Sequence, residues 1–513
     1  MNPCVKFLAG LACASAVVAT PARAQDDACN IDQNAPQFVG RAFFAVQKGI
    51  ATLNSNGDPA TDARTAVRLL TDPTARDRDK NPAGQAFTLG QALALLLTES
   101  SAPVNGTRAD FGFATDREQS ADLYVLADSI FTLVETLAPQ CASQVSAWRQ
   151  GPPWVGTMNK ALAALSEGRL DTAETLARRA LILDRNAPYA YVVLGGIARQ
   201  RLADGAAAAA DKTRLYTEAR SHLARALEIA QNDTQYVDVV RSSHYELGEL
   251  ASASIADAPV AERPVRAREA AEHFKQYAAL AESDLQRADA LQKIGEAFEA
   301  VNDTASIRAV YGGVSSNPAG YGERSLLTAG ILATRFGTSI QAAALYNAVL
   351  TSNPNHRDAL RNLSLTLIKL NDYAGLLPIT TRLTTIDPNN PENWVFHAYS
   401  YAGMAERASS AAQRRAYTDS STKYDRMASQ MPVRVSFTEF SPGEGEARLR
   451  GTIENLGTTP QTYTLIAEML DRSGNVVATE QAQVGPVEAK GTGEFDVTGK
   501  AIGIVAFRYK PLL

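Results

Sequence analysis

The residues best suited to chemistry are few in this sequence, and their spacing does not assemble a reactive site. None of the five histidines is three or four residues from another, so no helix face carries a histidine pair for a metal. The chain has no Gly-x-Ser-x-Gly elbow, no His-Glu-x-x-His motif and no phosphate-binding loop. We therefore predict no catalytic residue, no cofactor and no metal ligand. The histidines are His222, His244, His273, His356 and His397.

Two local patterns come closest to a site. Asp77-x-Asp79-x-Asn81 has the alternating oxygen ligands of a calcium loop. Pro82 stands where such a loop requires glycine and Thr88 replaces its closing glutamate, so we expect a solvated loop between helices. His397 follows a tryptophan on a packed helix face, and we expect it to be a buried, hydrogen-bonded imidazole.

The first residues have the pattern of a secretory leader. Lys6 precedes the apolar stretch Phe7–Ala19, and Ala22–Ala24 fits the small-x-small cleavage rule. We predict a signal peptide over residues 1–24 and a mature chain that begins at Gln25. A lipid anchor is the alternative, but Gly10 stands where a lipoprotein signal needs a large apolar residue before Cys13. The apolar stretch is too short to span a bilayer comfortably, and no later segment reads as transmembrane. The predicted location is periplasmic or secreted.

Export makes the cysteine count informative. Cys4 and Cys13 leave with the leader, so the mature chain keeps Cys29 and Cys141. Two thiols in an oxidising compartment favour a disulfide, which would close a loop of about 110 residues. Two unpaired, inert cysteines are the alternative. Two cysteines without a Cys-x-x-Cys pair do not fit a structural zinc site.

Composition limits the possible partners. The 513 residues carry a net charge of −5, 45% are hydrophobic and 20% are charged, so a large packed core is expected. A mildly acidic chain lacks the excess cations that binding to a polyanion requires, and 7% aromatic residues give little surface for stacking bases. We therefore expect no nucleic-acid partner. The length suggests about three folding units or a repeat array.

An internal repeat is the clearest signal in the chain. Pro354 and Pro388 are 34 residues apart, and the same interval separates the small residues Gly330, Ser364 and Ala398. This segment resembles tetratricopeptide (TPR) repeats, whose period is 34 residues. The resemblance implies pairs of antiparallel helices that cross closely at the small residues, each pair ending near its proline.

Weaker copies of the repeat extend upstream to about residue 154. We predict TPR-like repeats over 154–431 and a helical cap of degenerate repeats over 25–153. Apolar residues follow helical spacing within the cap, which predicts four helices there. These are Phe38–Leu53, Ala60–Leu70, Ala83–Leu97 and Ser120–Leu137.

The period changes at Pro432. From Val433 onward apolar residues alternate, and turn residues separate the runs, which predicts roughly seven short strands in an antiparallel sandwich over 432–513. The matching residues resemble immunoglobulin-like FxLYD-type envelope domains, although Leu470 replaces the family's tyrosine. The resemblance implies a binding or spacer module without catalysis. The residues are Gly451, Asn455, Leu470, Asp471, Gly474, Val476, Val477 and Phe495.

The fold class predicted is mainly α, a TPR-like α-solenoid followed by a small all-β antiparallel sandwich. The TPR resemblance implies a non-catalytic scaffold whose first helices line a groove for an extended peptide or a helix. By template position, that groove shows four cations with no acid interleaved, which suits an acidic segment or a carboxylate terminus. Ordinary surface cations are the alternative interpretation. The predicted groove residues are Arg324, Arg335, Arg361, Lys369 and Tyr399.

A second hypothesis places the function elsewhere. The protein would be a cell-wall-associated enzyme or a glycan-binding protein, with a site in the off-template N-terminal region and the helical array as its support. A pocket with convergent titratable groups would favour this reading over an open groove. The sequence leaves the partner's identity and the oligomeric state open.

Overall fold

The structure is a computed structural model in which residues 29, 31, 37–76, 81–98, 104–203 and 209–512 are described. The chain forms two compact units, Met1–Leu250 and Ala251–Leu513, and each is described here by itself. The predicted leader and the aspartates of the candidate calcium loop lie outside the described residues. The division after Leu250 falls inside the segment that was predicted to hold the repeats.

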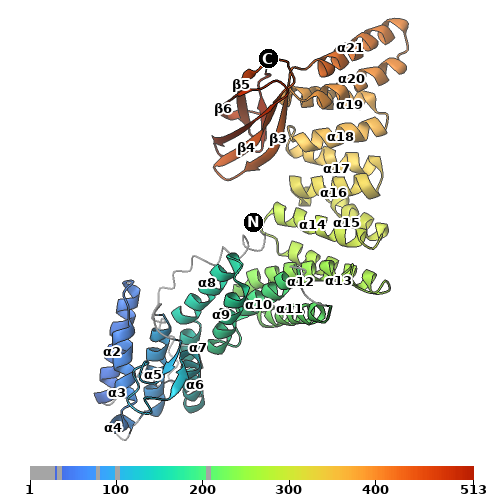
Figure 1. Ribbon diagram of the computed structural model, residues 1–513. Helices are drawn as coiled ribbons and strands as arrows, with labels where there is room; N and C mark the ends of the chain where they lie inside the picture. The colour runs from blue at the N-terminus through green and yellow to red at the C-terminus, as the bar shows by residue number, and fades with distance from the viewer. Residues whose placement is uncertain are drawn as a thin grey trace. The chain divides into compact units, whose positions relative to one another are not determined.

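Helices that the apolar periodicity predicts build the start of the first unit (Figure 1). All four predicted helices are present, with small shifts at their ends. The central one, α5, has no charged residue and is buried along most of its length, and α2, α3 and α6 pack against it. The elements are α2 (Gln37–Asn54), α3 (Ala60–Leu70), α4 (Pro73–Arg76), α5 (Pro82–Thr98), α6 (Leu123–Leu137), η2 (Pro139–Cys141) and α7 (Ala142–Arg149).

A short hairpin interrupts this helical region and was not predicted. Strands β1 (Asn105–Thr107) and β2 (Ser120–Asp122) pair antiparallel between α5 and α6. Their connecting loop buries Phe111 and Phe113, and the Arg108 guanidinium lies 4.2 Å from the centre of the Phe113 ring. Three-residue strands are too short to show an alternating pattern, so no sequence signal predicted them.

The predicted pairing of Cys29 with Cys141 is present as a disulfide. It connects the chain before α2 to η2, the turn that follows α6. Cys141 is fully buried and packs in an apolar cluster with Phe131, Val134 and Val145. The covalent link therefore lies inside the core of the first unit.

Repeat helices complete the first unit. The small residues expected where helices cross are fully buried, including Ala161 on α8 and Ala173, Ala177 and Ala180 on α9. Gly168 adopts a left-handed backbone, φ 74°, in the turn between α8 and α9. The elements are α8 (Pro152–Ser166), α9 (Leu170–Leu183), α10 (Pro188–Ala203), α11 (Ala209–Ala230), η3 (Thr234–Tyr236) and α12 (Val237–Ala253), whose last turn crosses the division.

The 34-residue period sets the last three helix pairs of the second unit. The first helices of three successive pairs, α16, α18 and α20, begin at Glu323, Arg357 and Pro391, which are 34 residues apart. The elements are α13 (Arg263–Ala279), α14 (Asp284–Glu299), α15 (Thr304–Ser316), η4 (Pro318–Gly320), α16 (Glu323–Phe336), α17 (Ser339–Ser352), α18 (Arg357–Lys369), α19 (Tyr373–Ile386), α20 (Pro391–Glu406) and α21 (Ala411–Ser429).

Gly330 lies at a close crossing of α16 and α17. A Cβ atom on Gly330 would lie 2.6 Å from Cε1 of Tyr346, whose side chain is fully buried. Gly330→Leu should therefore lower the free energy of unfolding by about 1–3 kcal/mol through overpacking. Chemical denaturation measures the change. Gly313→Leu on α15 is the control, because nothing lies within 4 Å of a Cβ there. Equal stability of the two variants would contradict the close crossing.

An all-β sandwich follows α21, which confirms the predicted order of the fold. Its sheets have strand orders β3-β4-β7 and β6-β5-β8, and every pairing is antiparallel. Roughly seven strands were expected, and the described residues contain six. Strand β8, only four residues long, was missed. The strands are β3 (Val433–Pro442), β4 (Glu446–Asn455), β5 (Gln461–Leu470), β6 (Val476–Val487), β7 (Thr492–Lys500) and β8 (Ala506–Tyr509).

Candidate functional site

The 34-residue period places several of the predicted groove residues at equivalent positions of successive first helices. Ile331, Leu365 and Tyr399 occupy the same place on α16, α18 and α20, and Arg335 and Lys369 share a second place. We call the set below the first-helix surface. It comprises Arg324, Leu327, Ile331, Arg335, Arg361, Leu365, Lys369, Val395 and Tyr399.

Two of the four predicted cations are neutralised by acids on neighbouring first helices. Arg361 on α18 makes two hydrogen bonds of 2.8 Å to the carboxylate of Glu392 on α20. These bonds hold the pKa of Arg361 above its ordinary value. Arg335 on α16 pairs with Glu299 on α14. The sequence showed no acid among the predicted groove residues, with Glu392 only flanking them. In the structure Glu392 and Glu299 pair with two of the arginines from 31 and 36 residues away along the chain.

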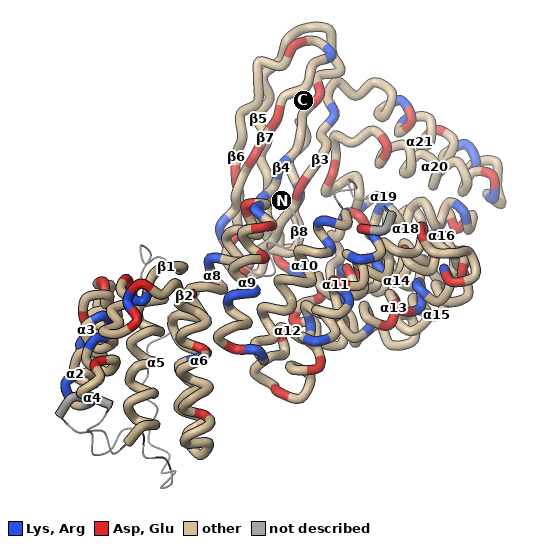
Figure 2. Tube along the Cα trace, turned by 60° about the horizontal axis from the view of Figure 1, so that its bottom comes forward, with Lys and Arg blue, Asp and Glu red and all other residues tan. Residues whose placement is uncertain are grey.

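The other two cations remain exposed. Among the described residues, Arg324 and Lys369 have no ion pair. Asp284, the first residue of α14, fixes the backbone of Arg324 by accepting its amide hydrogen at 2.8 Å. The same carboxylate accepts hydrogen bonds from Gly322 and Ser325, so it caps α16 from the preceding first helix. Figure 2 shows basic and acidic positions intermixed along these helices rather than gathered by sign.

Apolar side chains form a column at the equivalent positions. Ile331 is 42% exposed and Tyr399 is 53% exposed, and Leu365 between them is half-buried. The residue before each one, Gly330 or its 34-residue equivalents, is buried. In each first helix, a small residue therefore packs inward, and the larger apolar residue that follows it in the sequence lies toward solvent.

The neighbouring aromatic residues serve the packing of the last helix pair. Trp394 and Tyr401 on α20 each stack on Tyr424 of α21, with ring centres 5.7 and 5.5 Å apart. His397 is buried against the same ring, and its Nδ1 lies 2.9 Å from Oγ1 of Thr380. Burial lowers the pKa of His397. The predicted buried, hydrogen-bonded imidazole is confirmed.

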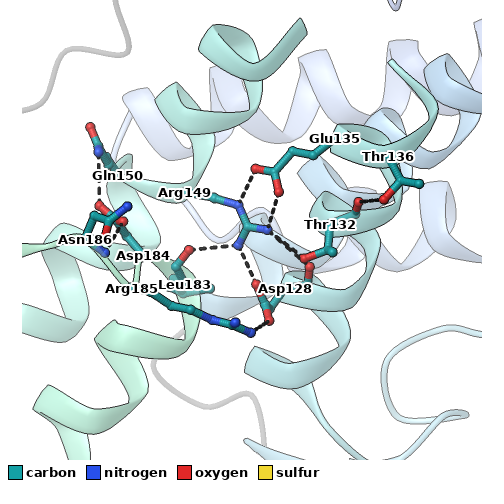
Figure 3. Close-up of polar contacts among 10 residues, drawn as sticks. All are labelled: Asp128, Thr132, Glu135, Thr136, Arg149, Gln150, Leu183, Asp184, Arg185 and Asn186. Carbon is teal, nitrogen blue, oxygen red and sulfur yellow. Dashed lines mark hydrogen bonds and ion pairs between the residues drawn. The ribbon is translucent and has the colours of Figure 1, made fainter. Parts of the chain in front are cut away.

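A polar network in the first unit has no counterpart in the sequence analysis (Figure 3). The side chain of Arg149, at the end of α7, is only 12% exposed. Its Nη1 donates to Asp128 of α6 at 2.6 Å and to the carbonyl of Leu183 at 2.9 Å, and its Nε donates to Glu135 at 3.0 Å. Burial lowers the pKa of Arg149, but the two carboxylates outweigh it and the net shift is upward. The guanidinium thus joins α6 and α7 to the end of α9.

Two features are absent from the described residues. Among them, no three His, Cys, Asp or Glu side chains are grouped closely enough to hold a metal ion. Within the same ranges, no helix combines the length and the apolarity needed to cross a bilayer.

Comparison with known proteins gives likeness at the level of structure. No family model matches the sequence, and no curated protein matches it. A structure described as "Functional Characterization of Pseudomonas Aeruginosa pilF" is 14% identical, with coverage of 53% of this chain and 90% of that chain and a TM-score of 0.23. A tetratricopeptide repeat protein from Parabacteroides merdae ATCC 43184 is 12% identical, with coverage of 52% and 98% and a TM-score of 0.27.

Proposed function

We propose that this protein is an exported, non-catalytic scaffold that binds a protein or peptide segment on its first-helix surface. The observation that carries the proposal is the column Ile331, Leu365 and Tyr399, an apolar ladder that repeats with the helices and is open to solvent. The residues that carry most of the affinity of protein interfaces are enriched in tyrosine, tryptophan and arginine, so Tyr399 is the expected main anchor.

The pairing of charges changes the partner chemistry that we propose. Glu299 and Glu392 form ion pairs with Arg335 and Arg361. Fewer cations are therefore free to bind a strongly acidic ligand than the sequence indicated. We propose a partner segment with several apolar residues for the column and an occasional acid for Arg324 or Lys369.

Export is part of the proposal. A disulfide persists in oxidising compartments, and the Cys29–Cys141 bond suits the periplasm or the cell exterior. The predicted leader over residues 1–24 provides the route.

In-cell crosslinking with the mature protein as bait tests the surface. Ile331→Ser with Tyr399→Ser should reduce capture of the principal partner at least tenfold, because two anchor side chains are lost. The arginines Arg335 and Arg361 are left intact, since reversing them would break ion pairs within the array. Ile340→Ser is the control, as Ile340 is 71% exposed but lies on the second helix α17. Undiminished capture by the double variant would overturn the proposal.

A further inference from the structure

Two turns of the helical array contact the β-sandwich of the second unit. Both turns follow the second helix of a pair, so they are equivalent in the repeat. The first ends α17: Asn353 donates from Nδ2 to the carbonyl of Val505, just before β8, at 3.1 Å. The same Nδ2 donates to Glu323 at 2.9 Å. Arg472, in the turn between β5 and β6, lies 3.5 Å from the other oxygen of Glu323. The beginning of α16 and the end of α17 therefore both meet the sandwich.

The second turn follows α19 and makes more hydrogen bonds with the sandwich than the first turn does. The hydroxyl of Tyr509, the last residue of β8, donates to Oδ1 of Asp387 at 2.8 Å and accepts the amide hydrogen of Asn389 at 2.9 Å. The side chain of Asn389 then binds the backbone of Leu512 twice, through its carbonyl at 3.0 Å and its amide at 2.8 Å. Val435 of β3 donates its amide hydrogen to the carbonyl of Asn389 at 3.0 Å.

These groups are removed from solvent. Tyr509 and Asp387 are each 2% exposed. Burial first, and then the charge of Asp387, keep the pKa of Tyr509 well above its ordinary value, so its phenol stays a donor. A buried donor or acceptor that loses its partner pays the cost of desolvation without compensation. Separation of the sandwich from α19 would have to break all of these bonds together.

Arg357 fills the space between the two turns. It stands at the start of α18, where its 34-residue equivalent on α16 is Glu323. Its guanidinium lies 4.2 Å from the ring centre of Phe437 and 4.3 Å from that of Phe507, both in the sandwich, and 3.0 Å from Asp387. Aromatic rings on both sheets thus contact a cation of the array.

We propose that the β-sandwich is a docked cap of the last repeats, latched by residues 509–512, and that helices α18–α20 and the sandwich open as one cooperative unit. The sequence left open whether this module binds a ligand or serves as a spacer. A spacer on a flexible joint would leave the turns after α17 and α19 in water, whereas here they are paired with the sandwich. This inference does not depend on the proposed partner surface.

Native-state hydrogen exchange of the full mature protein tests the latch. Tyr509→Phe removes only the hydroxyl that bridges Asp387 and Asn389. Amide exchange should accelerate about tenfold or more in β8 and, together with it, in α18–α20, because one opening exposes both. Tyr463→Phe is the matched control: Tyr463 is also buried in the sandwich core, and its hydroxyl has no hydrogen bond to the described helices. It should leave exchange in α18–α20 unchanged.

A variant on the array side completes the test. Asn389→Ala removes the clamp on Leu512 and should reproduce the same coupled acceleration. The two changes combined should have less effect than the product of their separate effects, because both release one latch. If Tyr509→Phe or Asn389→Ala accelerates only its own side, or the wild-type sandwich and α18–α20 open at clearly different rates, the sandwich is an independent module and the proposal fails.

Discussion

Replacing Arg149 by methionine should lower the free energy of unfolding of the first unit by about 3 kcal/mol, the low end of the cost of breaking a buried ion pair, because Asp128 is largely buried but Glu135 is 37% exposed. The change leaves two carboxylates, Asp128 and Glu135, without their counter-charge. The guanidinium of Arg149 now neutralises both, between α6 and α7. It also leaves the carbonyl of Leu183 without its donor, so the connection from α7 to α9 is weakened at the same time.

Arg185→Met is the matched control for this prediction. Arg185 reaches the same carboxylate, Asp128, at 3.4 Å, but its side chain is 80% exposed. Exposed pairs contribute about 0–1 kcal/mol, so the control should be nearly neutral. Urea titration of both variants, followed by circular dichroism, measures the difference. If Arg149→Met costs no more than Arg185→Met, the network does not stabilise the first unit.

Loss of the disulfide should have an effect of similar size. The bond closes a loop with a sequence separation of 112 residues. Removal of a native disulfide typically costs about 2–5 kcal/mol, mainly by freeing the unfolded chain. Cys29→Ala with Cys141→Ala should therefore lower the denaturation midpoint clearly.

Reduction provides the control for the disulfide. A thiol reductant should bring the wild-type protein to the stability of the double variant and should leave that variant unchanged. Thiol labelling of the unfolded, unreduced mature protein should find no free cysteine. Two reactive thiols would show that the bond does not form.

Local patterns account for most of the fold. The apolar spacing predicted α2, α3, α5 and α6 nearly to their ends, because a helix face repeats within one turn. The 34-residue interval between Gly330 and its equivalents predicted the helix pairs of the second unit, since each close crossing needs a small residue. Alternation after Pro432 predicted most of the strands.

Contacts between distant residues could not be predicted in the same way. Tyr509 and Asp387 are separated by more than 120 residues. No pattern in the sequence around either residue indicates that the two are in contact. Arg149 reads in the sequence as an ordinary helix-ending cation, and only packing shows that it bonds to residues of α6 and α9. The pairing of Arg361 with Glu392 likewise depends on how neighbouring first helices lie together.

We propose that a partner segment lies along the column of Ile331, Leu365 and Tyr399. Hydrogen exchange of the mature protein, measured with and without the purified partner that crosslinking identifies, tests this most directly. We expect new protection in α16, α18 and α20, with the second helix α17 little changed on its Ile340 face. Protection confined to the first unit or to the sandwich strands, with the three first helices unaffected, would contradict it.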